Sequence, residues 1–236
     1  MIELTGYLSG RRYPGRGVLF GIVPGGAYAA ASYFIMGRSS NSRNRVFEKT
    51  EDGAMARAYD AKLVSDPSLI LYAPVRFCGG ALVVTNGDQT DTICSYLNNG
   101  GSFRSALLTR RYEPDAPHFT PRISGILRVQ NGRAHYTLSI LRKAPAAMDC
   151  LRDFYEYADC PAGTGHFIHT YEEGPDPLRT FAGEPRPVLL PEGPIGRFAE
   201  TLWNSLDPEN RISLYVCFLP LDGGEPRTEL RNARDK

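Results

Sequence analysis

The chain of 236 residues predicts an α+β fold that is rich in antiparallel strands. Short runs of apolar or alternating residues recur along the chain, which is typical of strands. Only a few stretches place apolar residues at the spacing of an amphipathic helix. Glycine, proline and asparagine lie between the runs, as expected for tight turns. A chain of this length can bury a sizeable core.

The strands are expected where the apolar runs lie. An Asn131-Gly132 step between two of these runs is typical of a hairpin, and Pro24-Gly25-Gly26 marks another turn. In chain order, the expected strands are Val18–Val23, Tyr28–Met36, Leu69–Arg76, Ala81–Thr85, Ile123–Val129, Ala134–Leu141, Gly165–Thr170 and Ile212–Leu219.

Helices are fewer than strands. The first is expected over Thr90–Asn98, where Ile93 and Leu97 fall on one face. Asp88 or Thr90 would cap its beginning. The other expected helices cover Phe103–Arg110 and Ile195–Leu206.

A proline-rich connection lies between Pro175 and Pro194. It predicts a long extended segment, because proline cannot continue a helix or donate to a sheet. Only a short remainder of the chain follows it, which favours an excursion within one domain over a linker. We therefore expect a single domain that covers residues 1–236.

Composition argues against several classes of protein. Hydrophobic residues make up 42% and charged residues 22%, which is ordinary for a soluble globular protein. The net charge of +1 argues against nucleic acid as a partner. The apolar runs are too short to span a membrane, and the N-terminus lacks the features of a signal peptide. The cysteines show no C-x-x-C spacing and are odd in number, so we expect reduced thiols and a cytoplasmic location.

The segment 37–45 concentrates three arginines among three serines and two asparagines. Guanidinium groups present forked donors that suit phosphate, so this segment predicts an anion site. The alternative is an arginine-rich surface loop.

Other candidate site residues also have two interpretations. Tyr72 can be a buried proton donor or an ordinary core tyrosine. Glu113 can act as a general base if partial burial raises its pKa, or it can be a solvated carboxylate paired with Arg110 or Arg111. The junction 86–93 can contact sugar hydroxyls or a heterocycle, or it can only cap the helix that follows.

Several standard signatures are absent from the sequence. There is no G-x-x-x-x-G-K-[ST] loop, no G-x-G-x-x-G and no G-x-S-x-G. His166 and His169 are three residues apart in an expected strand, so they should point to opposite faces and cannot chelate one metal ion. We expect no metal site.

In combination, these segments resemble the archaeal-type IMP cyclohydrolase family. The resemblance is carried over residues 30–185 by the following motifs, in chain order: Arg38-Ser39 with Asn44-Arg45, Tyr72, Thr85–Ile93, Tyr112–Asp115, Thr120–Ile123, His169–Glu172 and Ala182–Pro185. Tyr13–Gly17 and the region 203–219 are expected to exceed the compact archaeal pattern, as in a longer, bacterial-style member.

The resemblance implies a fold and an activity. The fold would be a four-layer αββα sandwich resembling N-terminal nucleophile hydrolases. The activity would be closure of 5-formamidoimidazole-4-carboxamide ribonucleotide (FAICAR) to IMP, without metal or cofactor and without a covalent intermediate. The second residue is Ile2, so a nucleophilic N-terminal residue is not expected. The protein would be a homo-oligomer, either a dimer or a tetramer.

The resemblance also implies roles for individual residues. Arg38 would polarise a substrate oxygen or bind phosphate, Tyr72 would donate to the oxyanion, and Glu113 would orient or deprotonate the carboxamide nitrogen. The residues expected to bind substrate are Ser39, Asn44, Arg45, Asn86, Thr90, Asp91 and Arg122. The alternative functions are a non-catalytic purine-nucleotide-binding module on the same fold and amide hydrolysis by an N-terminal nucleophile.

Overall fold

The computed structural model describes residues 1–64, 71–146, 148–174 and 176–234. Within these residues the fold is α+β, with strands in two seven-stranded sheets. Strand pairing is antiparallel in the described residues except between β1 and β12. The predicted class and the dominance of antiparallel strands are thus confirmed.

The first sheet contains the first and the last strands of the described residues. Its strands, in spatial order, are β1 (Ile2–Glu3), β12 (Arg186–Leu189), β11 (Thr164–His169), β2 (Arg16–Ile22), β3 (Tyr28–Met36), β13 (Arg211–Pro220) and β14 (Arg227–Asn232). The second sheet is a meander in reverse chain order. Its strands are β10 (Cys150–Tyr157), β9 (Arg133–Lys143), β8 (Arg122–Gln130), β7 (Ala81–Thr85), β6 (Tyr72–Cys78), β5 (Gly53–Ala58) and β4 (Arg45–Thr50).

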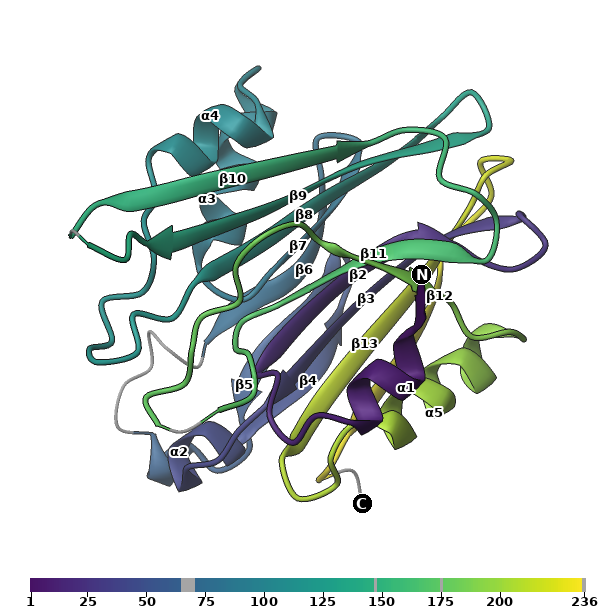
Figure 1. Ribbon diagram of the computed structural model, residues 1–236. Helices are drawn as coiled ribbons and strands as arrows, with labels where there is room; N and C mark the ends of the chain where they lie inside the picture. Colours follow the sequence, from purple (N-terminus) through teal and green to yellow (C-terminus); the bar gives the residue numbers. More distant parts are fainter. Residues whose placement is uncertain (65–70, 147, 175, 235–236) are drawn as a thin grey trace.

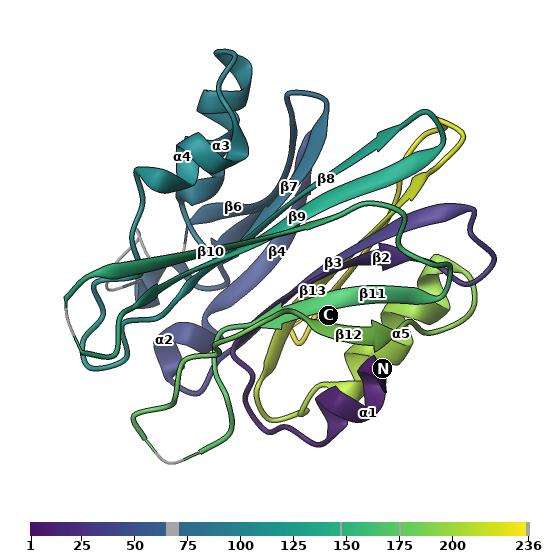
Figure 2. The same ribbon diagram turned by 45° about the horizontal axis from the view of Figure 1, so that its top comes forward.

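The helices lie mainly on the outer faces of the sheets. Helices α1 (Leu4–Ser9) and α5 (Ile195–Ser205) cover the first sheet, and α3 (Gln89–Asn98) and α4 (Phe103–Leu108) cover the second (Figures 1 and 2). The short helix α2 (Ser40–Arg43) connects β3 to β4, and a 3₁₀ turn spans Ala61–Leu63. No helix in the described ranges is long and apolar enough to span a membrane.

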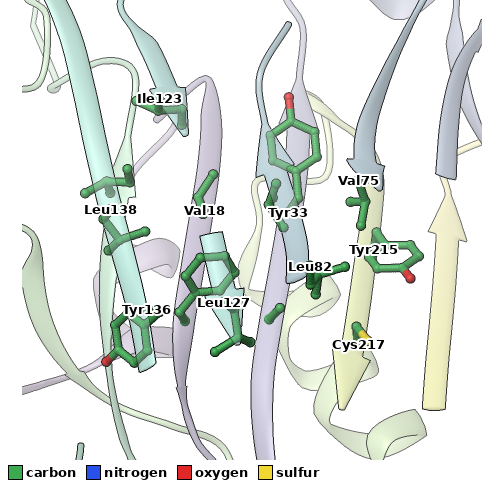
Figure 3. Packing of buried hydrophobic residues seen from close by; sticks show 14 of the residues in the cluster. Val18, Tyr33, Val75, Leu82, Ile123, Leu127, Tyr136, Leu138, Tyr215 and Cys217 are labelled. Carbon is green, nitrogen blue, oxygen red and sulfur yellow. The ribbon is translucent and has the colours of Figure 1, made fainter. Parts of the chain in front are cut away.

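The main core lies between the two sheets. Alternation along β2 places Val18 and Phe20 on the inner face, where they join Leu82 of β7 and Leu138 of β9 (Figure 3). The intervening Leu19 faces the other way and packs with α1 and α5. Full burial of each such side chain stabilises the fold by about 1.5–3 kcal/mol.

The predicted strands are found at or within a few residues of their expected positions. The hairpin at Asn131-Gly132 is also confirmed, because both residues have the positive φ that such a turn needs. The strand expected at Leu69–Arg76 begins at Tyr72, and residues 69 and 70 lie outside the described part. The predicted helices are confirmed, although the second ends at Leu108 rather than Arg110. The proline-rich segment contains a strand, β12, that joins the first sheet.

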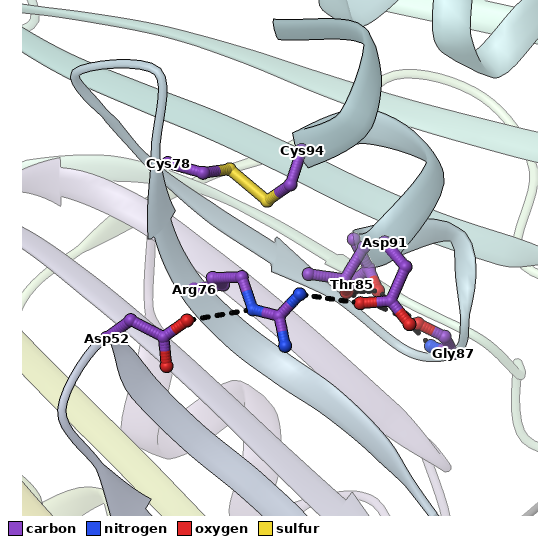
Figure 4. The surroundings of a disulfide bond; sticks show 8 residues. Asp52, Arg76, Cys78, Thr85, Gly87, Asp91 and Cys94 are labelled. Atoms are coloured by element: carbon purple, nitrogen blue, oxygen red, sulfur yellow. Dashed lines mark hydrogen bonds and ion pairs between the residues drawn. A yellow bond between two sulfur atoms is a disulfide. The ribbon is translucent and has the colours of Figure 1, made fainter. Parts of the chain in front are cut away.

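The prediction that all cysteines are reduced is wrong. Cys78, at the end of β6, and Cys94, in α3, form a disulfide with their Cα atoms 5.6 Å apart (Figure 4). Sequence spacing could not indicate this pair, because the two residues meet only when α3 folds back over the strands that precede it. Cys150, Cys160 and Cys217 are free thiols, and Cys150 and Cys217 are buried.

His166 and His169 lie on opposite faces of β11, as predicted. The Nδ1 of His166 lies 2.7 Å from Tyr136 Oη. On the other face, Tyr7 Oη lies 2.7 Å from His169 Nε2, and His169 Nδ1 lies 2.8 Å from the Tyr171 carbonyl oxygen. Since a carbonyl only accepts, Nδ1 donates, and Nε2 accepts from Tyr7 when the ring is neutral. Burial lowers the pKa of His169 to about 3.

This histidine should make folding sensitive to acid. Between its ordinary pKa of 6.5 and the folded value of about 3, the unfolded state binds a proton that the folded state does not. Its contribution to the free energy of unfolding is therefore lost as the pH falls through this window, by about 1.4 kcal/mol per pH unit. Urea unfolding at pH 7 and pH 5 measures the effect. His169→Gln should reduce the loss, whereas the exposed control His135→Gln should not, and equal losses in both variants would contradict the assignment.

Candidate functional site

Strand ends from both sheets meet at one edge of the molecule. Antiparallel pairing brings the starts of β2, β6 and β8 beside the ends of β3, β7 and β11. The residues at these ends include Arg16, Tyr72 and Arg122. The candidate site is thus built on strand ends and on the loops that leave them, a common place for polar side chains on a rigid frame.

An outer cavity of about 320 Å³ opens at this edge. Residues of the arginine-rich segment line it together with aromatic, hydroxyl and carboxylate side chains from other parts of the chain. The lining residues are Tyr13, Arg16, Arg38, Ser39, Asn41, Ser42, Arg45, Asp115, His118, Thr120 and Tyr171.

The arginine-rich segment folds around its own serines. Ser39 caps α2: its Oγ accepts from the Ser42 backbone N–H at 3.1 Å, and Ser42 Oγ donates to the Ser39 carbonyl oxygen at 2.9 Å. This reciprocal cap closes a single turn of helix. The turn positions Arg45, whose Nε donates to the Ser42 carbonyl oxygen at 2.8 Å.

The arginines of this segment differ in burial and in charge pairing. Arg38 is exposed, pairs with Asp176 at 3.0 Å and lies over the Tyr13 ring. Arg45 is only 3% exposed and has no carboxylate partner among the described residues. Burial, together with the charge of Arg16, lowers the pKa of Arg45. The segment is therefore only partly a surface loop, because Arg45 is held in the interior at the cavity wall.

An inner cavity of about 90 Å³ adjoins the outer one. It is lined by Arg16, Tyr72, Asn86, Gly87, Asp88, Glu113, Asp115 and Thr120. Arg16, Asp115 and Thr120 line both cavities, so these three residues form the junction between them.

Two tyrosines meet beside the inner cavity. Tyr72 Oη lies 2.9 Å from Tyr33 Oη, and Tyr72 is 4% exposed. Burial raises the pKa of Tyr33 well above its ordinary value, so Tyr33 keeps its proton. Tyr33 can donate this proton to Tyr72, which leaves the Tyr72 hydroxyl free to donate into the cavity.

Glu113 lines the inner cavity and is held by Arg122, which lies behind it. Arg122 Nη1 lies 2.9 Å from Glu113 Oε1 and 2.7 Å from Asp88 Oδ1. Arg122 Nε donates to the Arg111 carbonyl oxygen at 2.9 Å. Burial raises the pKa of Glu113, although the charges of Arg122 and Arg16 oppose this effect. Glu113 needs partial burial to act as a general base, and the structure shows that it is partly buried.

Comparison with known proteins gives the family. The sequence profile described as IMP cyclohydrolase-like protein matches residues 13–223. The chain belongs to this family. A protein of Methanopyrus kandleri named IMP cyclohydrolase is 27% identical over 224 residues, which cover 93% of this chain and 100% of that protein.

The family match extends beyond the expected region. It begins at residue 13 and ends at residue 223, so it includes Tyr13–Gly17 and the region 203–219, which lie outside the residues 30–185 that carried the resemblance. Both segments lie inside the part of the chain that defines an IMP cyclohydrolase-like protein. Their sequences carry no catalytic signature, and for this reason the resemblance started at residue 30.

The structure brings together part of the predicted site. Arg38, Ser39 and Arg45 line the outer cavity, and Tyr72, Asn86 and Glu113 line the inner one. Asn86 also joins two loops, because Nδ2 donates to the Pro121 carbonyl oxygen and Oδ1 accepts from the Ile123 N–H, each at 2.9 Å. It therefore supports the inner wall as well as facing it.

Four of the predicted binding residues line neither cavity. Asn44 holds the backbone of Asp60 through two hydrogen bonds of 2.8 Å. Thr90 is buried against Thr85, with their Oγ1 atoms 2.6 Å apart. Asp91 pairs with Arg76 at 2.7 Å, close to the disulfide (Figure 4). Arg122 has its donors engaged by protein groups and so supports Glu113 rather than an open anion site.

Several cavity residues were not among the predicted ones. Asp115 and Thr120 belong to motifs that carried the resemblance, and Asp115 Oδ1 accepts from the Thr120 N–H at 2.7 Å. Tyr171 stacks on Tyr13, with ring centroids 6.0 Å apart. Arg16 follows Gly15, whose φ of +81° and close approach to Thr170 leave no room for a Cβ. The available signal was Gly15 in the Tyr13–Gly17 segment, since glycine marks positions that need a positive φ or a close approach of the backbone.

The described residues contain no group of histidine, cysteine and carboxylate side chains that could hold a metal ion.

Proposed function

We propose that this protein is an IMP cyclohydrolase, which closes the ring of FAICAR to IMP with loss of water. The observation that carries the proposal is the inner cavity, where a tyrosine hydroxyl and a partly buried carboxylate line a common space beside an arginine-lined cavity. Membership of the family and the Methanopyrus kandleri relative support the same activity. The pathway would be de novo purine biosynthesis.

The two adjoining cavities suit the two ends of a nucleotide. Arg38 and Ser39 lie in the outer cavity, so the phosphate would bind there through forked and hydroxyl donors. Of the two roles that the resemblance implies for Arg38, its position supports phosphate binding. The ribose would cross the junction, and the imidazole with its two substituents would reach the inner cavity.

The chemistry needs no covalent intermediate. The carboxamide nitrogen bonds to the formyl carbon, and the formyl oxygen leaves as water. The two hydrogens of that water come from the carboxamide nitrogen and the formamido nitrogen. Glu113 would accept the carboxamide proton, and Tyr72 would donate to the oxygen as it becomes an oxyanion. Because both arms belong to one molecule, holding them in contact contributes several kcal/mol of the acceleration.

The wider properties that the resemblance implies are part of this proposal. Helices on the outer faces of two packed sheets support a four-layer αββα sandwich of the kind found in N-terminal nucleophile hydrolases, formed by one domain over residues 1–236. We also infer a homo-oligomer, either a dimer or a tetramer, and a cytoplasmic location where purine synthesis would supply the substrate.

The test is turnover by the purified protein. FAICAR should be converted to IMP, followed by absorbance and confirmed by chromatography, without an added metal or cofactor. Absence of turnover would contradict the proposal. If IMP then raised the thermal midpoint, the result would instead support a nucleotide-binding module without catalysis.

A further inference from the structure

Arg16 is fixed at the junction of the two cavities. It begins β2, and its backbone is held from both sides by Thr170: the Arg16 N–H donates to Thr170 Oγ1, and the Thr170 N–H donates to the Arg16 carbonyl oxygen, each at 3.0 Å. Its side chain lines both the outer and the inner cavity. Among the described arginines that line these cavities, it is the one common to both.

The charge of Arg16 is not neutralised by the protein. No carboxylate among the described residues forms an ion pair with it, and its buried Nε has no hydrogen-bond partner. Two neighbouring arginines differ in this respect. Arg38 pairs with Asp176, and Arg122, behind the inner cavity, pairs with Glu113 and Asp88. Arg45 also lacks a carboxylate partner, but it lines the outer cavity.

An uncompensated cation at a partly buried position is costly unless a ligand completes it. An arginine stays protonated under all ordinary conditions, so it cannot escape this cost by losing its proton. Its charge also acts on the site already described, because it opposes the rise in the pKa of Glu113. The free guanidinium therefore faces the space in which Tyr72 and Glu113 would act.

Ring closure requires stabilisation of a developing negative charge, which the other residues do not fully provide. Negative charge develops on the formyl oxygen, close to the negative charge of Glu113. Tyr72 can offer one neutral donor, and the donors of Arg122 are already engaged. A preorganised positive charge aimed at such an oxygen stabilises it strongly.

We propose that Arg16 is a catalytic residue, whose guanidinium donates to the formyl oxygen as that oxygen becomes an oxyanion. This inference rests on the proposed function and assigns it a residue. We place the phosphate at Arg38 and Ser39 rather than at Arg16. A phosphate at the junction beside Arg16 would leave the heterocycle outside the inner cavity.

The experiment compares Arg16→Ala, Arg16→Lys and Arg38→Met with the unaltered protein. Arg16→Ala should lower kcat by about 10²–10³-fold, as loss of an oxyanion donor does. The affinity for IMP should change little, because the product carries no oxyanion. Millimolar guanidinium should restore part of the Arg16→Ala rate, which a purely structural role would not allow. Arg38→Met should show the opposite pattern, with weaker IMP binding and a smaller loss of kcat.

Arg16→Lys keeps the charge and most of the stem, so it covers the case in which Arg16→Ala does not fold. It should still lose about tenfold in kcat, because an ammonium does not present forked donors. If the unaltered protein turns over FAICAR but Arg16→Lys or a folded Arg16→Ala matches its kcat, the inference is overturned and the proposed function stands. A loss confined to IMP affinity would also overturn it. An inactive unaltered protein would overturn both.

Discussion

Replacing Glu113 with glutamine should lower kcat by about 10²-fold or more, because an amide cannot accept the proton of the attacking nitrogen. The substitution keeps the size of the side chain and one oxygen that can accept from Arg122. Folding should therefore be preserved, and circular dichroism checks this. A kcat close to that of the unaltered protein would reduce Glu113 to a structural partner of Arg122.

The pH dependence of the rate gives a second measure of the same residue. Glu113 must be ionised to act as a base, and burial raises its pKa above the ordinary 4.5 against the opposing charges of Arg122 and Arg16. The rate of the unaltered protein should consequently fall as the pH falls through this raised pKa. The fall should be absent in Glu113→Gln. Glu48→Gln is the matched control, since Glu48 is an exposed partner of Arg57 and lines neither cavity.

Replacing Tyr72 with phenylalanine should also lower kcat by about 10²-fold, through loss of a donor to the oxyanion. The ring would stay buried, so the site would keep its shape. The substitution should lower kcat more than the affinity for IMP, because the Tyr72 hydroxyl donates to an oxygen that the product lacks. Steady-state kinetics and IMP titration separate the two quantities.

Tyr33→Phe is the paired control for this prediction. Tyr33 contacts Tyr72 at 2.9 Å but lines neither cavity. Either substitution leaves one buried hydroxyl without its partner and should cost about 1–3 kcal/mol of stability. If Tyr72→Phe and Tyr33→Phe lose the same stability but Tyr72→Phe loses much more kcat, the loss of kcat comes from the chemistry and not from folding. Equal losses of kcat in the two variants would contradict a direct role for Tyr72.

The fold was predictable where strands are continuously apolar. Tyr28–Met36 was expected at its observed bounds because β3 is central and almost wholly buried. The strands that were not predicted are β1, β4, β5, β10, β12 and β14. Two of them have polar exposed positions: β4 ends in Glu48-Lys49-Thr50, and β14 is half-exposed along most of its length. Both lie at sheet edges, where only part of a strand is covered and the apolar pattern fades. Helix α1 was missed because it is short and lacks a side-chain cap.

The site was predictable where a residue type carries its own chemistry. Arginines among serines indicated an anion wall, and Arg38, Ser39 and Arg45 do line one cavity. Which residues of a motif face the ligand depends on packing, however. Thr90 and Asp91 come shortly after Asn86 in the sequence, yet they do not line the inner cavity with it. In helix α3, Thr90 contacts Thr85 and Asp91 contacts Arg76.

Arg16 illustrates what sequence reading lacks. A single arginine after a glycine has no signature, and its role depends on two facts that need coordinates. One is its place at the junction of two cavities, and the other is the absence of a carboxylate to pair with it in the described part of the chain. The disulfide was missed for the same reason, since Cys78 and Cys94 meet only through tertiary structure.

A crystal structure of the protein with IMP tests the central claim most directly, because that claim is the placement of one nucleotide across two cavities. The account predicts the phosphate beside Arg38 and Ser39, the ribose at the junction, and the six-membered ring between Tyr72, Glu113 and Arg16. A heterocycle stacked in the outer cavity with the phosphate at Arg16, or IMP bound away from this edge of the sheets, would contradict it.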